Sequence, residues 1–103
     1  MFMRVIGKDK LTEFYKKHSD SRKPLLRWLK ITENICWNSF TDLKQTFGSA
    51  DLYTQGTQHY ILFNIGGNKY RLVTAINFKG QIVIVEVIMA HTEYSKNRWK
   101  GKL

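Results

Sequence analysis

The chain has 103 residues, of which 43% are hydrophobic and 14% aromatic, so it can build one hydrophobic core, and we expect residues 1–103 to form a single domain. Seventeen lysines and arginines against eight acidic residues leave a net charge of +9, which is typical of a small protein that binds a polyanion such as nucleic acid. The single cysteine, Cys36, and the lack of an apolar run long enough for a signal peptide or a membrane span exclude the secreted and membrane-spanning classes, and we expect a cytoplasmic protein with no membrane partner.

Helical spacing dominates the first half of the chain. A short strand is predicted over residues 2–6, followed by a helix over residues 8–17 whose apolar side chains recur at helical intervals. Pro24 fits the first turn of a second helix, and Ser21 is a candidate N-cap for it. A short helical turn is expected over residues 40–47. We expect the second helix to pack on a flat surface through an apolar stripe of Leu25, Leu29, Thr32 and Cys36.

The second half changes to the period of β-strands. Three runs rich in isoleucine, valine, phenylalanine and tyrosine are separated by Gly66-Gly67-Asn68 and by Lys79-Gly80, which are typical of tight hairpins. We therefore predict an α+β fold in which an antiparallel meander carries two helices on one face. Residues 91–99 are expected to form a turn or a short C-terminal helix. The three runs cover residues 59–65, 69–78 and 81–89.

Alternation along the strands assigns the side chains to two faces. With a two-residue loop at Lys79-Gly80, Arg71 lies opposite Ile88. Glu86 then lies opposite Val73, diagonally across from Arg71, on the face turned away from the helices. A charge in a central strand is costly unless it is paired or functional, so we expect a site on that second face. The face under the helices is expected to hold Tyr70, Leu72, Thr74, Ile76, Phe78, Val83, Val85, Val87 and Met89, together with Ile61, Phe63 and Ile65.

Three side chains could carry chemistry there. Arg71 offers a planar guanidinium suited to phosphate oxygens, His91 can give or take a proton near neutral pH, and Tyr94 can stack on a base or supply a hydroxyl. Such groups match metal-independent RNA cleavage, which needs a base for the 2′-hydroxyl, a cation for the phosphate and an acid for the leaving oxygen. One cysteine and three scattered histidines give no zinc-ligand spacing, so we expect no metal site.

Each of these residues also has a purely structural interpretation. Arg71 could pair with Glu86 and serve only to stabilise the sheet. His91 could cap a helix, and Tyr94 and Trp99 could form an apolar patch that anchors the tail. Spacing alone leaves both interpretations open.

The most specific motif is the hairpin YILFNIGGNKYRLV, residues 60–73, which resembles the HigB branch of the RelE-like toxins of type II toxin–antitoxin systems. The segment VIMAHTEY, residues 87–94, is similar to the closing strand and tail of that branch. Ala90 and Ser95 depart from the threonine and aspartate that are usual there. The order of strand, two helices and sheet also matches, so the resemblance covers nearly the whole chain.

The resemblance implies a ribosome-dependent endoribonuclease that cuts messenger RNA in the A site of the 70S ribosome, with no metal or organic cofactor. It also implies a HigA-like antitoxin with a helix-turn-helix domain, through which alone the toxin would reach operator DNA. By position, Arg71 matches the arginine that stabilises the cleaved phosphate, and His91 and Tyr94 match the catalytic and base-stacking segment. RNA-binding roles follow for Asn68, Lys69, Lys96, Arg98 and Lys100.

Three other functions remain open from the sequence. The same small fold is shared by ParE-like toxins that inhibit DNA gyrase without nuclease activity, so the fold alone does not separate the two activities. A non-enzymatic nucleic-acid-binding module and a toxin that has lost its activity also fit the composition. The combination of Arg71, His91 and Tyr94 favours the nuclease, because a gyrase inhibitor needs no such cluster.

Overall fold

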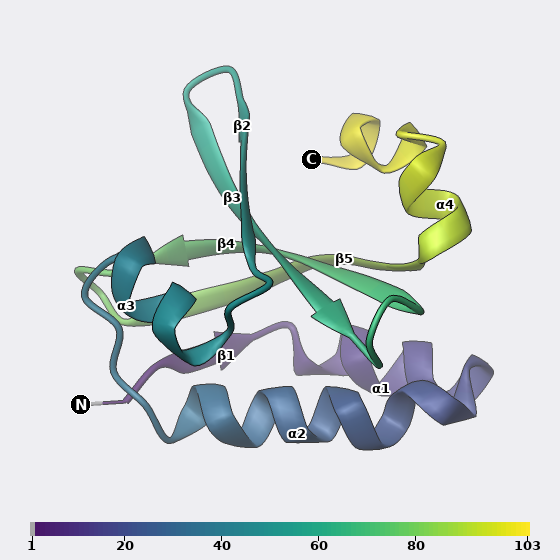
Figure 1. Ribbon diagram of the computed structural model, residues 1–103, viewed down its shortest axis with the longest axis horizontal. Coiled ribbons are helices and arrows are strands. Elements are labelled where there is room, and N and C mark those ends of the chain that lie inside the picture. Colours follow the sequence, from purple (N-terminus) through teal and green to yellow (C-terminus); the bar gives the residue numbers. More distant parts are fainter. Residues whose placement is uncertain (1) are drawn as a thin grey trace.

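The computed structural model describes residues 2–103. In chain order its elements are β1 (Arg4–Ile6), α1 (Lys8–Lys17), the 3-10 turn η1 (Ser19–Ser21), α2 (Arg22–Glu33), α3 (Phe40–Thr46), β2 (Asp51–Gln55), β3 (Gln58–Ile65), β4 (Tyr70–Asn77), β5 (Ile82–Ala90), α4 (His91–Ser95) and the 3-10 segment η2 (Arg98–Lys102). Helices α1 and α2 lie along one face of a five-stranded sheet, and α4 lies on the other side, which confirms the α+β class (Figure 1). No helix within residues 2–103 is long and apolar enough to cross a membrane.

The sheet contains more than the predicted meander, which is confirmed as β3, β4 and β5. Strand β1 forms one edge and pairs in parallel with the start of β5, so the whole sheet is mixed. Strand β2 forms the other edge and pairs antiparallel with β3. The sequence pattern does not predict β2, because its side chains are exposed or half-buried and show no clear hydrophobic alternation.

The helices form where the sequence predicts them. Helix α1 begins directly after Gly7, which has a left-handed φ of 93° and lies so close to β5 that a Cβ would be 3.2 Å from the carbonyl oxygen of Val85. Pro24 lies in the first turn of α2 as expected. The short turn before the strands is confirmed as α3, whose N-cap Ser39 accepts a hydrogen bond from the amide of Asp42 at 3.2 Å.

Two details of α2 differ from the prediction. Ser21 occupies the N-cap position, but its hydroxyl donates to the carbonyl of His18 at 2.6 Å and does not cap the helix. Cys36 is exposed because α2 ends before it, at Glu33, so it does not belong to the apolar stripe. Leu25 and Thr32 are buried as the stripe predicts.

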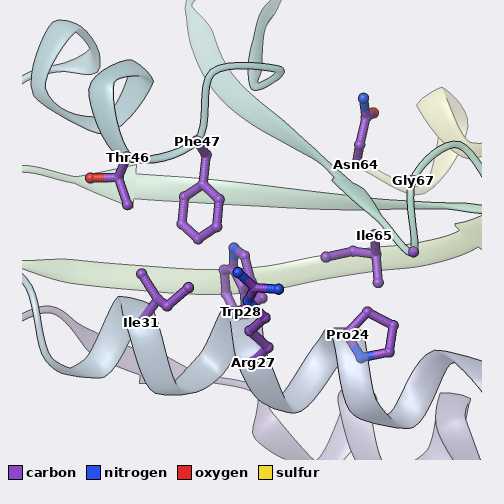
Figure 2. A pocket seen from close by; sticks show the side chains of 10 residues that line it. Pro24, Arg27, Trp28, Ile31, Thr46, Phe47, Asn64, Ile65 and Gly67 are labelled. Atoms are coloured by element: carbon purple, nitrogen blue, oxygen red, sulfur yellow. The ribbon is translucent and has the colours of Figure 1, made fainter.

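The main core lies between the two long helices and the sheet. Trp28 of α2 is 2% exposed and meets Phe63 of β3 edge-to-face, with ring centroids 5.4 Å apart. Figure 2 shows Trp28 and Ile31 rising from α2 toward the sheet. Trp37 donates its indole N–H to the hydroxyl of Thr46 at 3.1 Å, which fixes α3 to the same core.

A β-bulge at Glu86 changes the register of the last hairpin. Near its turn the register is as predicted, up to Thr74 opposite Val85. Strand β5 then contributes the extra residue Glu86, and beyond it Arg71 pairs with Met89. The bulge therefore divides β5 into two halves whose alternation is out of step.

The bulge corrects part of the predicted face assignment, because a shift of one residue turns every following side chain over. The prediction places Arg71 opposite Ile88 and puts Val87 and Met89 under the helices. In the structure Ile88 packs under the helices, whereas Val87 and Met89 lie on the opposite face. The remaining buried apolar residues of the predicted helix-side set are found there, namely Ile61, Phe63, Ile65, Tyr70, Leu72, Val83 and Val85.

The face turned away from α1 and α2 carries a second apolar cluster. Its central side chains are buried because α4 and η2 fold over them, which confirms a short helix in the tail. Strand β4 is consequently buried on both faces, with Leu72 and Val73 each 0% exposed. The cluster comprises Tyr60, Leu62, Val73, Met89 and Trp99, with Tyr53, Ala75, Val87, Tyr94 and Leu103 packed against it.

A contact between Asp20 and Tyr70 ties the β3–β4 turn to the helical layer. The Tyr70 hydroxyl donates to the Asp20 carboxylate at 2.5 Å, and Lys69 pairs with the same carboxylate at 3.3 Å. The hydrogen bond from Tyr70 lowers the pKa of the Asp20 carboxyl below its usual 3.8. The same bond raises the pKa of the Tyr70 phenol above its usual 10.0. At neutral pH the carboxyl is therefore ionised and the phenol protonated, which are the forms that make this hydrogen bond.

Substitution and deletion at position 86 should have different effects. In Glu86→Ala the bulge remains and a half-buried side chain is lost, so we expect the free energy of unfolding to change by less than about 0.5 kcal/mol. Deletion of Glu86 removes the extra residue and closes the bulge, so regular alternation keeps Ile88 under the helices and Val87 and Met89 on the opposite face, and we expect only a moderate loss of about 0.5–3 kcal/mol from the changed strand twist and the lost contacts with α1. Urea unfolding measures both values. A loss far above about 3 kcal/mol in the deletion variant would show that Val87 and Met89 change faces when the bulge is closed, because each buried apolar side chain contributes about 1.5–3 kcal/mol.

Tyr70→Phe should reveal the pH range over which the contact with Asp20 stabilises the fold. Because the folded-state pKa of Asp20 is lowered, its contribution is present above the unfolded-state value of 3.8 and is lost as the pH falls through the folded-state value. The folded-state pKa of Tyr70 is raised, so the contribution of Tyr70 to stability is complete below the unfolded-state value of 10.0 and is lost as the pH rises through the folded-state value.

We therefore expect the wild type to melt above Tyr70→Phe at neutral pH, and the two melting temperatures to converge at both pH extremes. Tyr15→Phe is the matched control, because the Tyr15 hydroxyl has no hydrogen-bond partner among residues 2–103. A difference in melting temperature that did not vary with pH would contradict the role of the pair.

Candidate active site

Arg71 of β4 lies where the tail crosses the second face of the sheet. In the sheet register it is opposite Asn64 of β3 and Met89 of β5, so the three side chains share that face. Figure 2 shows Asn64 pointing away from α2, in keeping with this register. The guanidinium carbon of Arg71 lies 5.2 Å from the centroid of the Tyr94 ring, a cation–π contact that holds the cation against the tail.

The proposed pairing of Arg71 with Glu86 is not found. No carboxylate of residues 2–103 forms an ion pair with Arg71, whose guanidinium donates a long hydrogen bond of 3.4 Å to the carbonyl of Tyr70. The bulge turns Glu86 toward α1, where its carbonyl accepts a hydrogen bond from Lys10 at 3.2 Å. A half-buried guanidinium without a carboxylate keeps its donors for an incoming anion such as a phosphate.

Helix α4 brings His91 and Tyr94 to this arginine. The chain is extended at Ala90 and turns into the helix at His91, whose amide donates to the carbonyl of Lys69 at 2.9 Å. That bond joins the start of α4 to the β3–β4 turn. His91 and Tyr94 are three residues apart on the helix, so their rings lie on the same side, with centroids 6.2 Å apart and an angle of 22° between the planes.

An aromatic row extends from these residues to the edge of the sheet. Tyr94 stacks on Trp99 at 5.5 Å, Trp99 meets Tyr53 of β2 at 5.3 Å, and Tyr53 stacks on Tyr60 of β3 at 6.3 Å. The Nζ of Lys100 lies 4.9 Å from the Tyr53 centroid, so a second cation rests on the far end of the row. The candidate region thus holds two cations, Arg71 and Lys100, against one row of stacked aromatic rings, of which Tyr60 and Trp99 are buried.

Sequence reasoning did not assign Asn64, Tyr53 or Tyr60 to the candidate region. Asn64 could have been found, because strand alternation already places it on the same face as Arg71. Tyr53 could not, because β2 itself carries no clear strand signal. Trp99 is 4% exposed, so its interpretation as an anchor of the tail is confirmed.

The remaining residues with predicted RNA-binding roles lie around the cluster. Asn68 and Lys69 are exposed in the turn that contacts the start of α4. Lys96 is exposed directly after α4, and Arg98 is exposed and lines a hollow between the tail and α1. Lys100 is brought into the aromatic row. The structure therefore gathers the three catalytic candidates and spreads the cations over the surrounding surface.

The cluster can bind an anion and exchange a proton. Arg71 supplies a fixed cation, exposed His91 supplies an imidazole at the solvent boundary, and Tyr94 supplies a ring and a hydroxyl between them. Within residues 2–103 no group of histidines, cysteines and carboxylates could hold a metal ion. The arrangement fits phosphate chemistry performed by side chains.

A hollow of about 360 Å³ lies on the helix side of the sheet, between α2, α3 and the β3–β4 turn (Figure 2). Arg27, Trp28, Phe47 and Gly67 are among its lining residues, and none of the lining residues is a histidine or a carboxylate. The hollow lies across the sheet from Arg71. We therefore place the candidate active site at the Arg71 cluster and not in this hollow, because it lacks groups that could transfer a proton.

Comparison with known proteins relates the chain to one family. The model of the HigB_toxin family, described as the RelE-like toxic component of a toxin–antitoxin system, matches residues 21–97. The chain is similar to the mRNA interferase toxin HigB of Escherichia coli strain K12, with 38% identity over 64 residues, which is 58% of this chain and 61% of that relative. The mRNA interferase HigB of Shigella flexneri matches to the same extent, so the matched segment spans 61% of the length of both relatives. The mRNA interferase HigB of Escherichia coli O6:H1 is 24% identical over 94 residues, 91% of this chain and 90% of the relative.

The match to the family model, over residues 21–97, includes the parts of the chain that build the cluster. It runs from the start of α2 through the β3–β4 hairpin to the end of α4, so Arg71, His91 and Tyr94 all lie within it. A family match over more than half of the chain, together with the expected order of helices and strands, shows that the chain belongs to the HigB toxins, the RelE-like toxic components of toxin–antitoxin systems.

Proposed function

We propose that this protein is a type II toxin that cleaves messenger RNA in the A site of the translating ribosome. The observation that carries the proposal is the half-buried Arg71, which has no carboxylate partner within residues 2–103 and is held against Tyr94 beside His91. The similar proteins that are named mRNA interferases support the same reaction. A gyrase inhibitor or a simple nucleic-acid-binding module would need no such combination of groups.

Cleavage would use the 2′-hydroxyl of the RNA itself. A base removes the hydroxyl proton, and the 2′ oxygen forms a bond to the adjacent phosphorus. The bond from phosphorus to the 5′ oxygen of the next nucleotide breaks, an acid protonates that oxygen, and a 2′,3′-cyclic phosphate remains. Arg71 stabilises the negative charge of the pentacovalent phosphate, His91 transfers a proton, and Tyr94 stacks on a base or supplies its hydroxyl.

The partners follow from the same proposal. The net charge of +9, the exposed Asn68, Lys69, Lys96 and Arg98, and the half-buried Lys100 around the cluster suit contacts with the phosphates of messenger and ribosomal RNA. A toxin of this family would be neutralised by an antitoxin, which we propose to be a HigA-like helix-turn-helix protein. Operator DNA would then be contacted through the antitoxin.

The direct test is a purified translation reaction on a defined message, analysed by primer extension with and without this protein. We expect cuts within codons of the translated region, and none when ribosomes are omitted. An intact message in the complete reaction would overturn the nuclease proposal, and a DNA supercoiling assay with gyrase would follow.

Arg71→Ala should relieve growth arrest and lower the cleavage rate by about 100-fold or more, which is typical when one transition-state donor is removed. Arg71→Lys keeps the charge but loses the planar fork, so we expect it to restore only part of the rate. Arg4→Ala is the matched control, because Arg4 is an exposed arginine of β1 away from the cluster. Circular dichroism checks that each variant is folded, and full cleavage by Arg71→Ala would remove this residue from the mechanism.

Cleavage should require no divalent metal at the cut phosphate. A message with one phosphorothioate at the cut position tests this while the magnesium needed by ribosomes stays constant. Sulfur binds manganese better than magnesium, so a metal-dependent reaction would be slowed by sulfur and restored by manganese. We expect no restoration, and a clear recovery with manganese would contradict metal-independent cleavage.

A further inference from the structure

Trp99 belongs to η2, the last segment of the tail, and packs in the apolar cluster on the second face of the sheet. Its ring stacks on that of Tyr94, with centroids 5.5 Å apart and 13° between the planes. Its indole N–H donates to the backbone carbonyl of Tyr94 at 3.1 Å. One residue therefore holds both the ring and the main chain of Tyr94.

Helix α4 needs such support. It has five residues, too few to be stable as an isolated helix, and the last carbonyls of any helix lack partners within it. Asn97 adopts a left-handed φ of 60° after α4, which reverses the chain, and its amide donates to the carbonyl of Tyr94 at 3.1 Å. The reversal returns Trp99 under the helix, where its N–H gives the same carbonyl a second donor.

The other contacts of Trp99 join it to the sheet. It meets the ring of Tyr53 edge-on at 5.3 Å and belongs to the buried cluster that includes Val73 and Met89. Val73 and Met89 are neighbours of Arg71, one two positions along β4 and the other directly opposite on β5. Tyr94 is thus connected through Trp99 to the same part of the sheet that carries Arg71.

We propose that Trp99 is a positioning residue for the cleavage reaction. It fixes Tyr94, and through the cation–π contact the guanidinium of Arg71, in one arrangement relative to the RNA phosphate. This inference rests on the proposed nuclease function. Trp99 is 4% exposed and so does not contact RNA itself. Because a displacement of about 1 Å can slow a positioned reaction by about 100-fold, loss of Trp99 should lower the maximal rate and leave RNA and ribosome binding nearly unchanged.

The test compares Trp99→Leu, Trp99→Phe and the control Trp28→Phe in ribosome-dependent cleavage under single-turnover conditions. Trp28 is as deeply buried as Trp99, packs on an aromatic ring on the opposite side of the sheet, and its indole nitrogen has no hydrogen-bond partner among residues 2–103. Both the maximal rate and the toxin concentration at half-maximal rate are measured, with thermal melts to confirm folding.

We expect Trp99→Leu to lower the maximal rate by about tenfold or more, with the half-maximal concentration changed by less than about threefold. Trp99→Phe keeps an aromatic ring and loses the N–H, so its rate should lie between those of the wild type and Trp99→Leu. Trp28→Phe should cleave within about twofold of the wild-type rate even where its melting temperature falls as far as that of the Trp99 variants.

A double-mutant cycle with Tyr94→Ala shows whether Trp99 acts through Tyr94. If it does, Trp99→Leu and Trp99→Phe should slow the Tyr94→Ala protein far less than they slow the wild type. Losses that multiply, or a Trp99→Leu protein with the full maximal rate, would overturn the positioning role. An equal loss in Trp28→Phe would overturn it too, because stability alone would then explain the effect. A wild-type protein that cuts no message would instead overturn the nuclease proposal itself.

Discussion

The burial of β4 on both faces is the constraint on which the rest of the molecule depends. Leu72, Val73 and Thr74 follow one another in this strand, and each is 0% exposed, so apolar surface must cover both sides of the sheet. Helices α1 and α2 cover one side. The tail after β5 covers the other, and in doing so it carries His91 and Tyr94 to Arg71 (Figure 1). The packing that completes the second core is therefore the packing that assembles the candidate active site.

The bulge in β5 decides how charge is distributed on that second face. In a strand without the bulge, Glu86 would share a face with Arg71, and the two charges could neutralise each other inside the sheet. With it, Glu86 turns toward α1 and Met89 takes the place beside Arg71. The arginine then rests on the ring of Tyr94, which holds the cation without consuming its hydrogen-bond donors. Bulges are common next to active sites, where one extra residue redirects the side chains that follow.

Stability and chemistry share the same contacts in the tail. Helix α4 is short, and its shape depends on the amide of His91 bonded to the turn at one end and on Trp99 at the other. The β3–β4 turn that receives His91 is in turn held to the helical layer by Asp20 through Tyr70 and Lys69. The position of the histidine thus depends on a chain of contacts that reaches across the sheet from η1. A side chain far from the phosphate can in this way affect the geometry of the reaction.

Local periodicity in the sequence determined α1, α2 and the three-stranded meander, because a helix or a hairpin is specified by residues close together in the chain. The hairpin and tail motifs also identified Arg71, His91 and Tyr94 as candidates. Only the tertiary structure decided the parallel pairing of β1 with β5, the edge strand β2 and the bulge at Glu86, since these depend on partners distant in sequence. It alone also decided that Arg71 has a ring rather than a carboxylate beside it, because which groups meet across a sheet depends on how its two faces are covered.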